Sequence, residues 1–149
     1  MGIEKDIQQS QFRNEYQKAS INILFTANWL NEKIKQILDS EDITGQQFNI
    51  LRILRGSKGP LSTLQIRERM LDKMSDTSRL VDRLLKKGLV EKRVCTADKR
   101  LVDVSISPKG LQLLDRLDKK NEIMDNIIAS ISTEEASRLN ILLDKLRQA

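Results

Sequence analysis

Apolar residues in the first quarter of the chain recur three or four positions apart, which is the spacing of one face of an α-helix. This pattern predicts a long helix from about Phe12 to Leu38, with the stripe Ala19, Ile23, Ala27, Leu30, Ile34 and Ile37. Thr44 and Gln47 then have the spacing of a capping box, and apolar residues follow them directly. We therefore expect a second, shorter helix that ends near Gly56.

The next two predicted helices form a pair. Ser62 and Gln65 repeat the capping-box spacing at the start of a third helix of two to three turns. Ser75 is expected to cap a fourth helix over Ser75–Lys87, whose apolar residues follow one helical face. Gly88 stands where a left-handed residue ends a helix. Two capped helices separated by a few residues are typical of a helix-turn-helix.

A hairpin and two more helices are predicted beyond this pair. Residues 89–94 and 101–106 are rich in β-branched side chains and partly alternate, which favours a two-stranded hairpin with a basic tip. Ser107 and Pro108 are expected to begin a fifth helix of about twenty residues. The capping-box pair at Ser132 begins a sixth. The predicted fold class is therefore mainly α with a small β-hairpin wing.

The composition of the chain limits the kinds of site and the location that can be expected. The 149 residues are enough for one domain with a real core. The single cysteine, Cys95, cannot form an internal disulfide, and without histidine there is no set of zinc ligands, so we expect neither metal nor cofactor. The N-terminus is polar, and no stretch approaches the roughly 18 apolar residues of a membrane span, so we expect a cytoplasmic protein.

The positive charge is concentrated in one third of the chain. Residues 52–100 hold 14 Lys and Arg against 6 Asp and Glu, a local net charge of +8, whereas the rest carries 12 against 15, a net of −3. A segregated basic region attracts phosphate backbones through counterion release, which favours a nucleic-acid partner. A solvated, Lys-rich surface is the alternative interpretation.

The polar face of Ser75–Lys87 carries the groups that a helix needs in the major groove of DNA. Arg79, Arg83 and Lys86 lie three or four residues apart and hence on one side. Hydroxyls in the first turn can meet base edges or phosphates, although Thr77 also falls on the apolar stripe. The candidate DNA-contact residues are Ser75, Asp76, Thr77, Ser78, Arg79, Arg83 and Lys86. Taken in isolation, the same pattern also fits an ordinary surface helix.

The predicted hairpin tip supplies a second set of candidates, Asp98, Lys99 and Arg100. A charged tip that follows such a helix can reach a neighbouring groove, and a guanidinium gains from the negative potential of a narrow minor groove. Arg100 is the candidate for that insertion. Asp98 would repel phosphate, so we expect it to orient Arg100 or a backbone amide.

Residues 74–93 followed by 98–110 resemble the MarR family. The hallmarks of that family are an Asp-x-Arg wing, here Asp98 and Arg100, and a strand end of the form Val-x-Leu-Thr-x-x-Gly after a recognition helix. This chain reads Val-x-Ile-Ser-x-x-Gly at residues 104–110, which are two conservative departures. The resemblance extends in order and length from the first to the sixth helix.

The resemblance implies an architecture and a partner. It predicts one MarR-type domain over 1–149, with a winged helix-turn-helix DNA-binding lobe at about 42–107 and dimerisation helices at about 8–40 and 108–149. Ser75–Lys87 would be the recognition helix. A twofold dimer would place two such helices about one DNA turn apart and would read a pseudo-palindromic operator. An intramolecular antiparallel pair of C-terminal helices is the alternative for the dimerisation segment.

The resemblance also raises the question of a signal, because members commonly respond to small phenolic ligands or to cysteine oxidation. Phe25 and Trp29 on the first long helix could line a ligand pocket, although such aromatics are more often core. Cys95 is in the wing strand and not in the first helix, which argues against oxidation sensing. Its basic neighbours could nevertheless lower the pKa of the thiol.

The function predicted from these features is a sequence-specific, homodimeric, DNA-binding transcriptional regulator, a repressor that a small aromatic or phenolic effector could release. The alternative is a winged-helix protein–protein interaction module that binds an acidic partner. An enzyme is not expected, because the chain has no histidine, no Gly-rich phosphate loop and no nucleophile with a plausible base.

Overall fold

The computed structural model describes residues 2–94 and 102–148, which are mostly helical. The helices are α1 (Ile3–Asp6), α2 (Glu15–Leu38), α3 (Gly45–Gly56), α4 (Thr63–Arg69), α5 (Thr77–Lys86), α6 (Pro108–Asp118), α7 (Asn121–Asn126) and α8 (Thr133–Arg147), with a 3-10 turn, η1 (Asp39–Glu41). The strands are β1 (Leu61–Ser62), β2 (Val90–Val94) and β3 (Val102–Ile106). They form one antiparallel sheet in the order β1-β3-β2.

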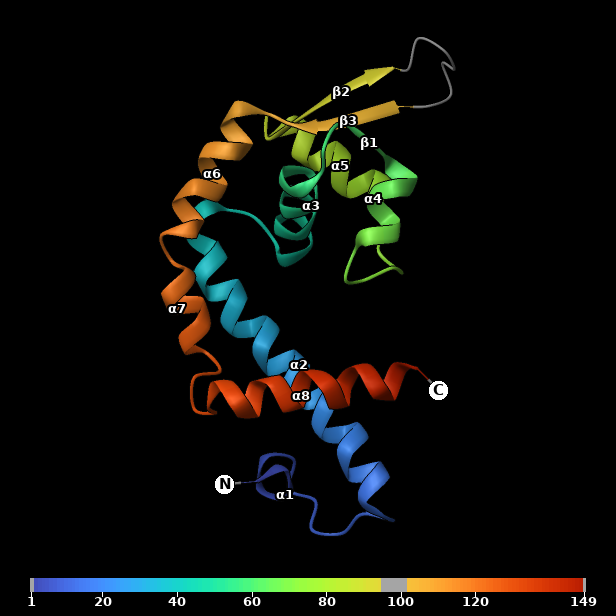
Figure 1. The fold of residues 1–149 in the computed structure, drawn as a ribbon, viewed down its shortest axis with the longest axis vertical. Coiled ribbons are helices and arrows are strands. Elements are labelled where there is room, and N and C mark those ends of the chain that lie inside the picture. The colour runs from blue at the N-terminus through green and yellow to red at the C-terminus, as the bar shows by residue number, and fades with distance from the viewer. Residues whose placement is uncertain (1, 95–101, 149) are drawn as a thin grey trace.

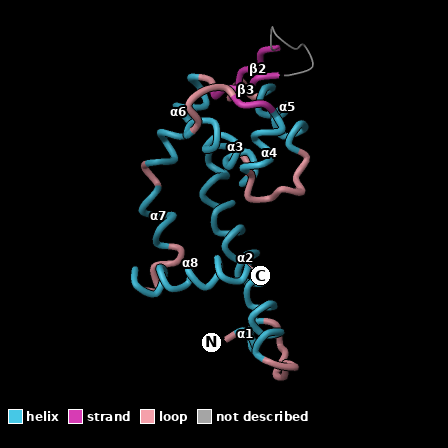
Figure 2. Tube along the Cα trace, turned by 45° about the vertical axis from the view of Figure 1, so that its right-hand side comes forward, coloured by secondary structure: helices cyan, strands magenta, loops and turns pink. Residues whose placement is uncertain are grey.

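The elements separate into two parts (Figure 1). We call α3–α5 and the sheet the wing lobe, and α2, α7 and α8 the stem. The hairpin β2–β3 lies at one end of the molecule and α1 at the other, and α6 connects the lobe to the stem. The view turned by 45° keeps this division, with α8 close to the middle of α2 in both (Figure 2). The fold class agrees with the prediction of a mainly helical protein with a small hairpin wing.

The buried core belongs almost entirely to the wing lobe and α6. Its fully enclosed side chains include Ile50, Leu51, Ile66, Leu84, Val104 and Leu114, and Leu38 joins them from the end of α2. In contrast, α8 has no buried residue. The lobe therefore has a complete core within one chain, whereas the stem does not.

Local capping signals place most helix starts as predicted. The capping boxes at Thr44, Ser62 and Ser132 are all formed, each with its side chain and backbone partners. In the last of these, the Ser132 amide donates to Glu135 at 3.0 Å and lowers the pKa of that carboxyl. Gly88 has a φ of 72° and ends α5, as expected of a left-handed terminator.

The predicted N-cap of the recognition helix was wrong by one residue. The helix begins at Thr77, and its cap is Asp76, whose Oδ1 accepts from the Arg79 amide at 3.2 Å. Ser75 makes no such contact, since its hydroxyl has no partner among the described residues. Either side chain can cap a helix, and the backbone path of the preceding turn decides which of them does.

Three other boundaries differ from the predictions. A third strand, β1, pairs with β3 through Leu61 and Val104, but two residues are too few to show an alternating pattern. The predicted fifth helix breaks into α6 and α7 at Lys119 and Lys120, where polar residues interrupt the apolar stripe. At the N-terminus, α1 was not predicted, and α2 begins at Glu15, with the Asn14 side chain as its cap.

No helix in the described ranges combines the length and the apolar character that a membrane span requires.

Gly110 fills a position where the backbone leaves no room for a side chain. A Cβ there would lie 2.3 Å from the carbonyl oxygen of Leu89 and 2.7 Å from Cγ1 of Ile106. That carbonyl already accepts from the Ser107 amide at 3.0 Å, and the Ser107 hydroxyl donates to the Gly88 carbonyl at 2.6 Å. The start of α6 is therefore fixed against the end of α5 by backbone contact.

We expect Gly110→Ala to lower the free energy of unfolding by about 1–3 kcal/mol, because the added methyl group must displace backbone or a buried side chain. Gly45→Ala is the matched control, since a Cβ at Gly45 meets nothing within 4 Å. That control should be neutral or stabilising by up to about 1 kcal/mol. Urea unfolding followed by circular dichroism measures both, and equal stability of Gly110→Ala and the wild type would contradict the close approach.

Candidate nucleic-acid interface

Helix α5 has one buried and one exposed face. Its buried side chains are Thr77, Leu80, Val81 and Leu84, and they pack against the rest of the wing lobe. The opposite face is exposed and carries Ser78, Arg79, Asp82, Arg83 and Lys86. A helix anchored along one side in this way presents a polar surface that can enter a groove without losing its packing.

Two of the charges on the exposed face are already paired. Arg79 Nε lies 3.6 Å from Asp76 Oδ2, and Lys92 of β2 brings its Nζ to 3.4 Å from Asp82 Oδ1. Arg83 and Lys86 form no ion pair with any described residue. The ion pair at Asp82 offsets the acidic charge on this face, so the uncompensated charge is basic.

The C-terminal end of α5 is held by polar contacts to other elements. The Nζ of Lys87 donates to the carbonyl of Asp42 and lies 3.5 Å from Gln47 Oε1. Lys109 of α6 donates to the Lys87 carbonyl at 3.0 Å, which satisfies a carbonyl at the helix end. These contacts fix the direction of the exposed face relative to α3 and α6.

The structure brings together four of the predicted contact residues, Ser78, Arg79, Arg83 and Lys86, on one exposed face. Asp76 is exposed at the helix start and serves as the cap. Thr77 is only 3% exposed, consistent with its place on the apolar stripe, and Ser75 is half-buried. The predicted wing residues Asp98, Lys99 and Arg100, and Cys95 as well, lie outside the described residues.

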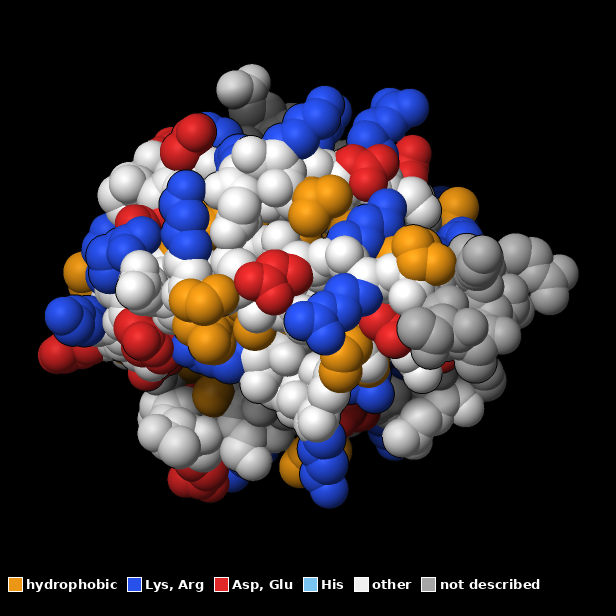
Figure 3. All heavy atoms as spheres, turned by 90° about the horizontal axis from the view of Figure 1, so that it is seen from above, with side chains coloured by type: hydrophobic (Ala, Val, Ile, Leu, Met, Phe, Trp, Pro, Cys, Tyr) orange, Lys and Arg blue, Asp and Glu red, His pale blue; other side chains and the backbone are white. Residues whose placement is uncertain are grey.

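Seen from the wing end, Lys and Arg side chains are spread over the surface and alternate with acidic and apolar groups (Figure 3). On this face they do not merge into one continuous basic patch. The concentration of positive charge along the sequence is therefore distributed in space over several elements. A nucleic acid would meet separate cationic positions at this end of the molecule.

Two basic residues near α5 were missed at the level of sequence. Lys92 lies on β2 and reaches the helix through Asp82. Arg67 lies on α4, and its Nε donates to the Lys73 carbonyl at 3.4 Å in the α4–α5 loop. Basic residues on the helix that precedes a recognition helix were the available signal, but only the fold shows which of them turns toward the loop.

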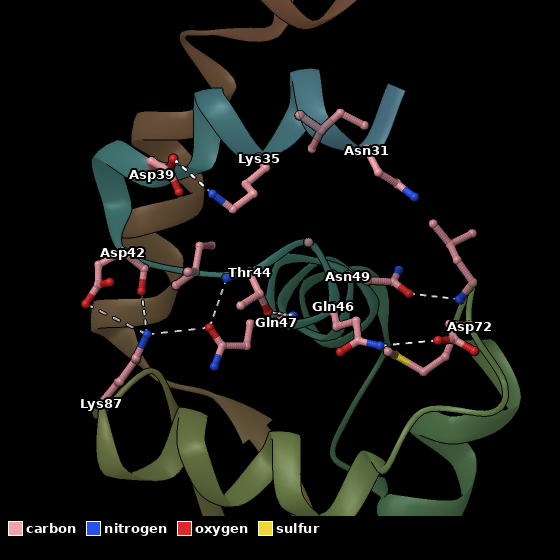
Figure 4. A pocket seen from close by; sticks show the side chains of 15 residues that line it. Asn31, Lys35, Asp39, Asp42, Thr44, Gln46, Gln47, Asn49, Asp72 and Lys87 are labelled. Atoms are coloured by element: carbon pink, nitrogen blue, oxygen red, sulfur yellow. Dashed lines mark hydrogen bonds and ion pairs between the residues drawn. The ribbon is translucent and has the colours of Figure 1, made fainter. Parts of the chain in front are cut away.

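A cavity of about 660 Å³ lies between the end of α2, the start of α3 and the α4–α5 loop. Figure 4 shows its polar side chains, with Lys87 directed at Asp42 and Gln47 on one side, and Gln46 and Asn49 facing the loop on the other. Its apolar lining comes from Ile34, Ile43, Met70 and Leu71. The cavity therefore touches both the stem and the wing lobe.

Phe25 and Trp29 do not line this cavity. They are 38% and 40% exposed on α2, on the N-terminal side of the cavity residue Asn31. Their role in a ligand pocket stays a prediction. In the described ranges, no three His, Cys, Asp or Glu side chains are grouped so that they could hold a metal ion.

The stem exposes many large apolar side chains. On α8 the exposed fractions are 45% for Leu139, 64% for Ile141, 60% for Leu142 and 61% for Leu146. Leu24 on α2 and Ile123 on α7 are also more than half exposed. Exposed apolar side chains in such number are typical of interaction sites.

The α4–α5 pair followed directly by the β2–β3 hairpin makes this chain a winged helix-turn-helix protein. A sequence model of the MarR family matches residues 41–101, which include α3, α4, α5 and β2. Over those residues the chain is similar to the MarR family.

Curated relatives cover most of the chain. The multiple antibiotic resistance protein MarR of Salmonella typhimurium is 25% identical over 123 residues, which cover 78% of this chain and 85% of the relative. The HTH-type transcriptional repressor MdtR of Bacillus subtilis is 26% identical over 121 residues, with 80% and 77% covered. Both of these relatives are named for regulation or resistance, and neither is named as an enzyme.

Solved structures show the same fold. A mutant of E. coli MarR in complex with operator DNA superposes with a TM-score of 0.82 at 22% identity, covering 92% of this chain and 99% of that one. The PcaV regulator of Streptomyces coelicolor, in complex with its natural ligand, gives a TM-score of 0.70 at 23% identity, with 83% and 90% covered.

Proposed function

We propose that this protein is a homodimeric, sequence-specific DNA-binding transcriptional regulator that represses a pseudo-palindromic operator. The observation that carries the proposal is the division of α5 into a buried apolar face and an exposed face on which Arg83 and Lys86 form no ion pair with a described residue. An α-helix fits the B-DNA major groove, where an arginine can donate two hydrogen bonds to one guanine.

The roles of the individual residues follow from this placement. Ser78, Arg79, Arg83 and Lys86 face the groove, and the hydroxyl of Ser78 is short enough to contact a base edge or a phosphate. From the sequence pattern, Arg100 of the wing enters the adjacent minor groove, with Asp98 as its orienting acceptor and Lys99 beside them. We assign DNA binding to about 42–107 and dimerisation to about 8–40 and 108–149.

Repression is supported by the relatives. MdtR is named a transcriptional repressor, and the E. coli MarR structure contains operator DNA. A protein that occupies an operator blocks access to it, and no cofactor is required for this mechanism. Action on bacterial DNA implies a cytoplasmic location. The alternative, a module for an acidic protein partner, is not favoured by relatives that are named as regulators.

The apolar surface of the stem supports the homodimer. A second copy that covers α8 and the neighbouring parts of α2 and α7 would bury side chains that are otherwise half exposed or more. Closed twofold assembly is the commonest way for identical chains to satisfy such a surface. It also supplies the second recognition helix that a pseudo-palindrome needs.

An effector that acts from the cavity would bridge stem and lobe. Its apolar wall and its amide side chains suit an aromatic ring with a hydroxyl group. Its lining contains Asp39, Asp42 and Asp72 against Lys35 and Lys87, so a neutral phenol fits better than a carboxylate. PcaV, which was solved with its natural ligand, has the same fold.

We expect Arg83→Ala to weaken operator binding by about 1–3 kcal/mol, because it removes a charged donor from the groove face. Arg100→Ala should weaken operator binding by a similar amount, because the Arg100 side chain is assigned to the minor groove. Bound fragments selected from the source genome provide the operator, and fluorescence anisotropy provides the affinities. Arg13→Ala, at the far end of the molecule, is the control. Operator binding that is unchanged in both wing-lobe variants would refute the assigned interface.

Sizing at micromolar concentration should give a species of about 34 kDa, twice the 17.1 kDa of the chain. Leu142→Glu should convert it to a monomer, because a carboxylate cannot be buried in an apolar interface without a partner. Leu71→Glu replaces an equally apolar, 88% exposed side chain in the lobe and should leave the dimer intact. A monomeric wild type, or a dimeric Leu142→Glu variant, would rule out this interface.

A substituted phenol such as 4-methylphenol should release operator DNA from the wild-type protein. Asn31→Trp places a large ring at the cavity wall and should abolish this release, whereas Glu32→Trp adds the same ring beside the cavity and should not. Fluorescence anisotropy of labelled operator during a phenol titration measures the effect. Release that is equal in both tryptophan variants would exclude this cavity as the effector site.

A further inference from the structure

The chain passes between the stem and the wing lobe twice (Figure 1). The first passage is residues 39–44, which lead from α2 through η1 to α3, and we call it the linker. The second passage is residues 107–120, which contain α6. Because these passages are the covalent connections between the two parts, contacts between them decide how the lobe is held on the stem.

Three consecutive residues of the linker are each contacted by a basic side chain from a distant part of the chain. The pairs are Ser40 with Lys120, Glu41 with Arg116 and Asp42 with Lys87. Lys120 and Arg116 belong to the second passage, and Lys87 belongs to the end of the recognition helix. Two of these contacts therefore join one passage to the other, and the third joins the linker to α5.

The contact between Arg116 and Glu41 is the most directional of the three. Nε of Arg116 lies 2.9 Å from each of the two carboxylate oxygens of Glu41. The side chain of Glu41 is only 13% exposed, so its charge is largely removed from water and requires a partner. An ion pair on an open surface contributes little to stability, but a partly buried, hydrogen-bonded pair fixes how two elements meet.

Helix α6 is in turn fixed to the wing lobe. Arg55 of α3 donates from its two terminal nitrogens to the two oxygens of Asp118, at 2.7 and 3.2 Å. On the opposite side of α6, Leu114 and Leu117 are enclosed in the core. Since α6 and the lobe form one packed unit, the ion pair from α6 to the linker relates the orientation of the lobe to the end of α2.

Packing alone leaves the direction of α2 open on one side. Leu38 is enclosed at the end of the helix, but Asn31 and Lys35 border the cavity of about 660 Å³ (Figure 4). Neither Glu41 nor Arg116 lines that cavity. Because closely packed side chains are what make an interior resist deformation, α2 can tilt toward the cavity unless a directional contact opposes it.

We propose that Glu41 and Arg116 are positioning residues for DNA recognition, because their ion pair sets the angle of the wing lobe on the stem. The inference rests on the proposed function, which supplies the dimer and the operator. In a twofold dimer each lobe carries one recognition helix, so a change of this angle in both copies moves the two helices relative to each other. The ion pair thereby selects the spacing of half-sites that the dimer accepts.

The first test measures the distance between the two recognition helices without DNA. A spin label at Ser78→Cys, in a Cys95→Ser background that removes the single native cysteine, reports this distance by double electron–electron resonance. The parent protein should give one narrow distribution. Glu41→Arg places two guanidinium groups together and should broaden or shift it. The matched control, Glu134→Arg, reverses a carboxylate that pairs with Arg138 at 2.8 Å within α8, and should change nothing.

Two double variants separate orientation from stability. Glu41→Arg combined with Arg116→Glu restores an ion pair of reversed polarity and should restore the narrow distribution. Glu41→Leu combined with Arg116→Leu removes the ion pair without leaving a buried charge alone, so its thermal midpoint should stay close to that of the wild type. Its distance distribution should nevertheless be broad. A distribution as narrow as the parent's, at the same distance, in this leucine pair would overturn the proposal.

The second test lengthens the spacer between the operator half-sites by one base pair. This insertion turns one half-site by about 35° and moves it by about 3.4 Å, so a dimer with fixed lobes must lose contacts. We expect wild-type binding to weaken by about tenfold, within the range that one mismatched base pair costs. The leucine pair should bind the native spacing more weakly than the wild type does, and should lose less affinity on the longer spacer.

The outcomes distinguish the inference from the proposed function. If the leucine pair and the wild type depend on spacing in the same way, the inference is overturned and the proposed function stands. If the wild type binds no operator at any spacing, both are overturned. A role of the ion pair in stability alone would lower the thermal midpoint and leave the preferred spacing unchanged, and that result would also contradict the inference.

Discussion

The arrangement of this molecule depends on a backbone junction where α5, the hairpin and α6 meet. The Leu89 amide donates to the Leu84 carbonyl, and the Leu89 carbonyl accepts from Ser107. Gly110 is placed so close to that carbonyl that a side chain would not fit. Because these contacts join backbone to backbone, they leave little freedom in the angle between α5 and α6. This junction therefore sets the direction of the exposed face of α5.

Helix α5 packs against the wing lobe with one face and exposes the other. Leu80, Val81 and Leu84 are enclosed by the lobe, so the arginines on the opposite side cannot turn inward. Thr77 belongs to the buried side by periodicity, yet its hydroxyl has no hydrogen-bond partner among the described residues. A fully apolar side chain at this position would pack without leaving a donor unsatisfied.

The stem and the lobe differ in how far one chain encloses their apolar residues. The lobe encloses its apolar residues within one chain, whereas Leu142 and its neighbours on α8 remain exposed. Exposed apolar side chains grouped in this way mark interaction surfaces. The cavity that contacts Ile34 of the stem and Met70 of the lobe lies where the two parts meet. A molecule bound there would contact both the stem and the wing lobe.

Residue spacing was enough to predict the features that depend on residues close together in the chain. The capping boxes at Thr44, Ser62 and Ser132 and the helical stripe of α5 involve contacts three or four positions apart, so spacing predicts them. Other features depend on contacts that exist only in the folded chain. These features depend on chain segments that meet through folding. They are the pairing of β1 with β3, the break between α6 and α7, the choice of Asp76 as cap and the approach of Arg67 to the α4–α5 loop. Local patterns carry no information about those distances, because the energy that selects them comes from packing between distant residues.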